Sequence, residues 1–117
     1  MTHATQEGFI RETTRAWESV GEGVRRKILG HDPQLMMVRV NFAKGSIGPV
    51  HTHPHRQVTF IAYGSLEVRI GREKQVLRSG DCYFIPPGVE HGVVALEESS
   101  LIDVFTPARE DFIIANG

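Results

Sequence analysis

Histidines gather at two points of the chain in a spacing that suits a metal ion. His51 and His53 stand two residues apart, and in a strand such a pair leaves the same face. Gln57 offers a carbonyl oxygen shortly afterwards, and His91 lies on a distant segment that a barrel can bring alongside. These four side chains are candidate ligands for one divalent transition metal, and the donor set does not distinguish Zn, Ni, Fe or Mn. The alternative is that they are ordinary surface or core residues, as we expect of His55, which falls in a turn.

A carboxylate interrupts an apolar run near the end of the chain. Asp103 is the only polar residue of the segment 101–105, and a carboxylate in a strand that is buried on both faces needs a partner or a function. Alternation puts Asp103 and Phe105 on one face, and Arg109 follows shortly after. Asp103 is therefore either an acid/base group, with Arg109 binding an anion, or half of a structural ion pair with a cation such as Arg39.

Short strands must position these side chains. Twelve glycines and six prolines punctuate the chain into segments that recur about every 8–12 residues, which is typical of an all-β sandwich or barrel. We predict strands over residues 24–29, 35–42, 50–53, 58–63, 66–70, 74–78, 81–85, 90–95 and 101–105. Residues 17–24 are predicted to be an entry loop. Tyr83 is expected to face inward, as a core aromatic or as a spare proton donor.

Length and charge exclude several classes of protein. The 117 residues suit one domain, which we place at residues 17–117, preceded by an N-terminal arm at residues 1–16. The net charge of −1, with no basic stripe, argues against nucleic-acid binding. No apolar run approaches ~18 residues and the N-terminus does not resemble a secretory signal, so we expect no membrane association. A single cysteine, Cys82, fits a reducing compartment and a cytoplasmic location.

The glycines and prolines around the histidines resemble the two cupin motifs. Residues 45–64 are similar to the first motif and residues 80–91 to the second, in the right order. This resemblance implies a single-domain cupin, a double-stranded β-helix or jelly-roll barrel, with the metal held by His51, His53, Gln57 and His91. Gln57 stands where most cupins carry Glu, so the ion would keep its full charge and attract an anionic oxygen such as a carboxylate. Ala95 also departs from the pattern, where Asn is common.

A narrower resemblance links the chain to the KdgF family of cupins. It rests on residues 24–30, 42–48, 93–98 and the run from Leu101 to Phe112. The resemblance implies that the protein converts 4,5-unsaturated uronates, the products of pectin and alginate lyases, to linear 5-keto-4-deoxyuronate. The substrate is then a small anionic sugar, and Asp103, Phe105 and Arg109 are the catalytic residues.

Two other functions stay open beside this one. The chain could be another small-molecule cupin enzyme, a dioxygenase or an isomerase, or a ligand-sensing cupin. Cupins often dimerise by strand exchange, so we expect a homodimer, for which the arm before Trp17 is a candidate element.

Overall fold

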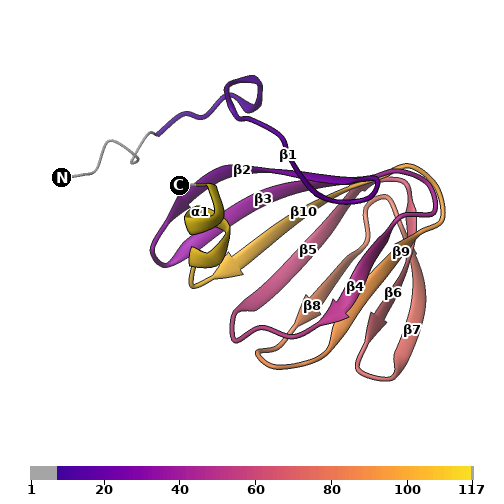
Figure 1. The fold of residues 1–117 in the computed structure, drawn as a ribbon. Coiled ribbons are helices and arrows are strands. Elements are labelled where there is room, and N and C mark those ends of the chain that lie inside the picture. The colour runs from indigo at the N-terminus through magenta and orange to yellow at the C-terminus, as the bar shows by residue number, and fades with distance from the viewer. Residues whose placement is uncertain (1–7, 117) are drawn as a thin grey trace.

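The computed structural model describes residues 8–116 and is built almost entirely from antiparallel strands (Figure 1). The elements are η1 (Glu12–Thr14), β1 (Glu18–Gly21), β2 (Val24–Asp32), β3 (Leu35–Phe42), β4 (Ile47–His51), β5 (Arg56–Tyr63), β6 (Ser65–Ile70), β7 (Glu73–Arg78), β8 (Cys82–Ile85), β9 (His91–Ala95), β10 (Ser99–Thr106) and α1 (Glu110–Asn116). No helix among the described residues is long and apolar enough to cross a membrane.

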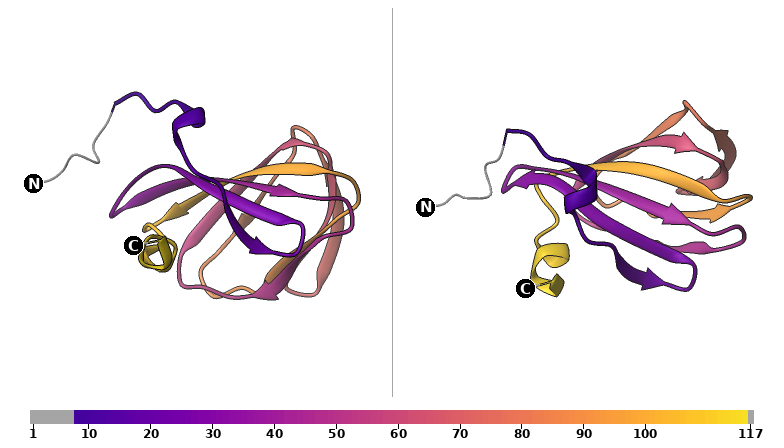
Figure 2. Two further views of the ribbon diagram at one scale, coloured as in Figure 1. Left: turned by 45° about the horizontal axis from the view of Figure 1, so that its top comes forward. Right: turned by 90° about the horizontal axis from the view of Figure 1, so that it is seen from above.

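The strands form two sheets that face each other. The larger sheet has the order β1-β2-β3-β10-β5-β8, and the smaller sheet has the order β4-β9-β6-β7. The two sheets splay apart at the end where α1 lies (Figures 1 and 2). The predicted all-β fold is therefore confirmed.

Alternation along each strand separates a packed interior from an outer face. On β5, Gln57, Thr59 and Ile61 are buried, whereas Val58 and Phe60 between them are exposed. A period of two is what a pleated strand with one buried face requires. The interior at the closed end is filled by aliphatic and aromatic side chains from both sheets. Polar interior positions are concentrated at the open end, where a site can form.

The N-terminal region differs from the prediction of an entry loop at residues 17–24. Glu18–Gly21 is an edge strand paired antiparallel with β2, so the loop prediction was wrong. A tight turn returns the chain, and Gly23 adopts a φ of 74°, which favours glycine. The glycines therefore mark a hairpin rather than an irregular segment. Residues 1–7 of the predicted arm lie outside the described residues.

Candidate functional site

The three candidate histidine ligands meet where β4 ends and β9 begins. His51, the last residue of β4, lies opposite His91, the first residue of β9. β4 ends at His51, so the predicted strand over residues 50–53 is misplaced and His53 lies in the connection that follows. Even so, one ring nitrogen from each histidine lies within 4.8 Å of the others. The three predicted histidines therefore lie together although only one of the pair is in a strand.

Backbone carbonyl groups orient all three imidazoles in the same way. Nδ1 of His51 lies 2.8 Å from the Pro49 oxygen, and Nδ1 of His91 lies 2.9 Å from the Val89 oxygen. Nδ1 of His53 lies 3.1 Å from the oxygen of His55. A carbonyl oxygen only accepts, so each Nδ1 carries the proton and each Nε2 keeps its lone pair. Metal-binding histidines are commonly oriented in this way.

Two further observations fit a cation at this point. Nε2 of His91 is buried and has no hydrogen-bond partner. Nε2 of His53 lies 2.9 Å from Oε1 of Gln57, whose amide nitrogen donates to the Thr59 hydroxyl at 2.8 Å. The amide oxygen and the unprotonated imidazole nitrogen are both acceptors, and a cation between such groups satisfies both. The residues present therefore fit a divalent metal ion.

Burial favours the neutral rings of His53 and His91, and metal binding requires neutral rings. Loss of water contact lowers the pKa of His91 to about 4, and it also lowers the pKa of His53. The lone pair of His91 is therefore available well below neutral pH, and the same effect favours the free lone pair of His53.

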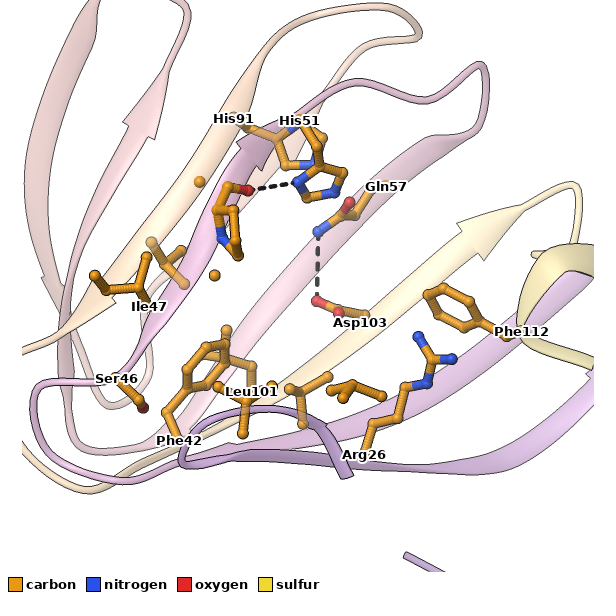
Figure 3. Close-up of a pocket in the computed structure, with 18 of the residues that line it drawn as sticks. Arg26, Phe42, Ser46, Ile47, His51, Gln57, His91, Leu101, Asp103 and Phe112 are labelled. Carbon is orange, nitrogen blue, oxygen red and sulfur yellow. Dashed lines mark hydrogen bonds between the residues drawn. The ribbon is translucent and has the colours of Figure 1, made fainter. Parts of the chain in front are cut away.

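A chain of hydrogen bonds leads from the histidines to Asp103. The Thr59 hydroxyl donates to Oδ1 of Asp103 at 2.6 Å, and the amide nitrogen of Gln57 lies 3.4 Å from the same oxygen (Figure 3). Burial raises the pKa of Asp103 to about 6, and neither the hydrogen bond from Thr59 nor the charge of Arg109 offsets that rise. A carboxyl group that titrates near neutrality can both give and accept a proton.

Asp103 does not form the structural ion pair that was the alternative. Arg39 points to the other face of the sheet, where it donates to Glu12 at 2.8 Å and to Ser100 at 2.9 Å. The alternative of a bridge between Asp103 and Arg39 is therefore wrong.

Arg109 lies at the open end of the same cavity. Its guanidinium donates twice to Asp111, at 3.0 and 2.8 Å, and stacks over the rings of Phe105 and Phe112. The cavity measures about 520 Å³ and is lined by His51, Gln57, His91, Asp103, Phe105 and Arg109, among others. The metal donors and the predicted catalytic residues therefore share one cavity.

The sequence did not decide the roles of Tyr83 and His55, and the structure places these two residues differently. Tyr83 is buried and lines the cavity, and burial together with the charge of Asp103 raises the pKa of its hydroxyl. His55 lies outside the group of three converging histidines, as expected, with its ring 5.5 Å from that of His53.

Three side chains of the site were not predicted from the sequence. Thr59 lies two residues after Gln57 and therefore shares its strand face, so this spacing could have identified it. Arg26 and Phe112 line the cavity from opposite ends of the chain, and Arg26 lies 3.6 Å from the centre of the Phe112 ring. No local pattern links residues so far apart, so only the fold reveals this contact.

The facing sheets and the histidine cluster are those of a cupin, and residues 38–105 match the family model of the cupin domain. A curated relative, "Pectin degradation protein KdgF" from Dickeya dadantii (strain 3937), is 50% identical over 90% of this chain and 96% of its own. The chain belongs to the KdgF family of cupins.

Two solved structures agree with this relationship. One is KdgF from Halomonas sp., with a TM-score of 0.87 and 38% identity over 92% of this chain and 99% of that one. The other is an RmlC-like cupin from Shewanella frigidimarina NCIMB 400, with a TM-score of 0.88 and 41% identity over 92% of this chain and 96% of that one.

Proposed function

We propose that this chain is a metal-dependent enzyme that converts 4,5-unsaturated uronates to linear 5-keto-4-deoxyuronate. The observation that carries the proposal is Asp103, a carboxyl group with a pKa of about 6 that is hydrogen-bonded through Thr59 toward the histidine cluster. A relative that is 50% identical and named for pectin degradation supports the same substrate class. In this proposal His51, His53, Gln57 and His91 hold one divalent ion.

The reaction needs a proton, a water molecule and a fixed sugar. The substrate is a cyclic enol ether with a carboxylate on C5, so C4 takes a proton and C5 takes the water oxygen. The resulting hemiketal opens when its bond from C5 to the ring oxygen breaks, which leaves a ketone at C5 and a second hydroxyl on C1. This hydrated C1 then loses water and becomes the aldehyde of the linear product. A bound divalent ion supplies a Lewis acid for the carboxylate. Asp103 moves the proton at C4 or orients the water.

The remaining residues hold the sugar for this step. Arg109 presents N–H donors to an oxygen of the sugar, and Phe105 packs against the ring and keeps water from that side. Because Asp111 already holds the guanidinium at two points, Arg109 is oriented before the substrate arrives.

The direct test is turnover of a 4,5-unsaturated monouronate, followed as loss of the enol-ether absorbance. We expect Asp103→Asn to lower kcat by about 10²–10⁴-fold, the usual contribution of general acid–base catalysis, with metal content unchanged. Asp81→Asn is the matched control, because this exposed carboxylate only caps a turn through the Arg78 amide. Near-parental kcat in Asp103→Asn would contradict the acid/base role. Metal binding by a parent protein that does not turn over the uronate would instead favour another cupin enzyme or a ligand sensor.

We also propose that the chain forms a homodimer through the outer face of its larger sheet. Neighbouring strands there expose a set of large apolar side chains, Leu35, Met37, Val58, Phe60 and Phe84, of which Phe84 is 55% exposed. These side chains are neighbours across adjoining strands and suit the apolar centre of an interface. In a two-fold dimer the same patch of each copy meets the other, so a second copy of the chain is its proposed occupant.

Sedimentation velocity tests this interface. We expect a dimer for the parent and for Val76→Glu, an exposed position on the other sheet, and a monomer for Phe60→Glu. A dimer that survives Phe60→Glu but is lost when residues 1–16 are removed would point to exchange of the arm instead. The cytoplasmic location stays a prediction.

A further inference from the structure

Arg26 is a charged side chain on the interior face of β2 that the proposed chemistry does not use. It lines the same cavity as His51 and Asp103 (Figure 3). Its Nε donates to Glu18 across the strand pair at 2.5 Å, and its guanidinium stacks on the ring of Phe112 at 3.6 Å. Two contacts therefore hold the long side chain in place inside the cavity.

Strand register places Arg26 beyond Asp103 as seen from the histidines. In the larger sheet Gln57 pairs with Phe105, and Thr59 pairs with Asp103. The next row on the same face runs from Leu101 through Val40 to Arg26. Rows on one face are about 7 Å apart. Asp103 therefore lies between the row of Gln57 and the row that ends at Arg26.

The shape of the sugar matches this order. In the proposed reaction the C5 carboxylate and the ring oxygen lie at the histidine end, and C4 lies at Asp103. Across a six-membered ring, C3 is opposite the ring oxygen and C2 is opposite C5. The hydroxyl groups on C2 and C3 therefore point away from the histidines, toward the end of the cavity where Arg26 lies.

The charge at this end favours hydroxyl groups over a second carboxylate. Glu18 balances Arg26, and Asp111 balances Arg109, so these two ion pairs add no net charge. A guanidinium has five N–H donors, and Glu18 receives only the one on Nε of Arg26. A rigid planar set of donors distinguishes the directions of neighbouring hydroxyl groups.

We propose that Arg26 binds the C2 and C3 hydroxyl groups and sets which unsaturated uronate the enzyme prefers, an inference that rests on the proposed function. Elimination makes C4 and C5 planar, so unsaturated uronates from different polysaccharides keep distinct configurations only at the other ring carbons. A residue that contacts C2 and C3 is therefore where they can be told apart. Arg26 touches the sugar but takes no part in proton transfer.

The test compares Arg26→Gln with Arg25→Gln, the adjacent exposed arginine, which stacks on Trp17 instead of lining the cavity. Both variants and the parent are assayed with the unsaturated monouronates from pectin and from alginate, which differ in configuration at C2. We expect Arg26→Gln to raise KM about tenfold or more, because a charge-assisted hydrogen bond to substrate is lost. Its kcat stays within about threefold, and the ratio of kcat/KM for the two sugars moves toward one. Arg25→Gln behaves as the parent.

Phe112→Leu removes the ring that stacks on Arg26 and on Arg109 and leaves both arginines, so its effect on KM measures how far this stacking orients them. Metal content and melting temperature are measured on every variant. An unchanged KM and sugar ratio in Arg26→Gln overturns the proposal. A parent that turns over neither sugar rejects the proposed function itself, and the inference with it.

Discussion

At the scale of single residues, the amide of Gln57 has two tasks that a carboxylate could not perform together. Its oxygen faces His53, and its nitrogen donates to Thr59 and lies near Asp103. A carboxylate has no proton to donate to Thr59 when ionised, and it adds a negative charge. Glutamine therefore keeps the positive charge of a bound ion undiminished and places no second anion beside Asp103.

Gln57→Glu tests this assignment. We expect the variant to keep its metal but to show a KM for the uronate raised several-fold, because the added charge opposes an anionic ligand. The second carboxylate should also raise the pKa of Asp103 further, which moves the limb of the rate profile that depends on Asp103 to higher pH. Metal analysis and a pH series of kcat/KM measure both effects. Gln75→Glu, on exposed β7, adds the same charge outside the cavity, and an equal effect there would argue against a local cause.

At the scale of elements, the crossing from β5 to β6 depends on one glycine. Gly64 adopts a φ of +94°, and a Cβ built there would lie 2.5 Å from the carbonyl oxygen of Glu98 and closer still to Oγ of Ser99. Gly80 has nearly the same φ, +95°, but a Cβ there meets nothing. The two positions share a backbone conformation but differ in the room available for a side chain.

This pair predicts two different losses of stability. Gly80→Ala should lower the free energy of unfolding by about 1–2 kcal/mol, the cost of a left-handed conformation with a Cβ. Gly64→Ala should lose about 3 kcal/mol or more, because overlap with the neighbouring strand adds to that cost. Urea unfolding of both variants measures the difference, and equal losses would show that the space around Gly64 adapts.

Elements with a clear period were predictable from the sequence, and those that depend on tertiary contacts were not. Alternation from Leu35 to Phe42 gives the bounds of β3 as observed. β1 is four residues long and lies at an edge, so its sequence carries almost no alternation. α1 is short, and it is held by tertiary contacts such as the packing of Phe112 against a core cluster that contains Met36 and Phe105. The four proposed donors could be named from the sequence because the motif marks them, even though His53 lies outside the strand that the spacing assumed. Arg26 could be placed only from the fold.

At the scale of the whole molecule, Asp103 makes stability depend on pH. Its folded pKa of about 6 lies above the ordinary value of 3.8, so between these values the folded state keeps a proton that the unfolded state loses. His91, whose pKa is lowered to about 4, contributes in the opposite direction, whereas Asp103 by itself lowers the free energy of unfolding of the metal-free protein as pH rises from about 4 to 6. The full loss reaches up to about 3 kcal/mol.

Asp103→Asn removes this dependence, because the amide does not titrate. Compared with the parent, the metal-free variant should gain up to about 3 kcal/mol between pH 4 and pH 6.5. The titration of His91 and the other groups is common to both proteins and largely cancels. Urea unfolding at four pH values gives the difference, and a difference that stays constant with pH would contradict the raised pKa. At pH 6.5 the variant is expected to be more stable than the parent but inactive, as is common when a catalytic group lowers the stability of the fold.

The four proposed donors do not belong to one sheet. His51 and His91 come from the smaller sheet, Gln57 from the larger sheet, and His53 from the segment that joins them. A half-folded chain with only one sheet formed has an incomplete set of donors and little affinity for the ion. The free energy of binding is therefore available only to the fully docked fold, and it opposes separation of the sheets as well as global unfolding. A bound ion thus makes the molecule more cooperative, joining two halves that side-chain packing alone would let open separately at the end where the sheets splay.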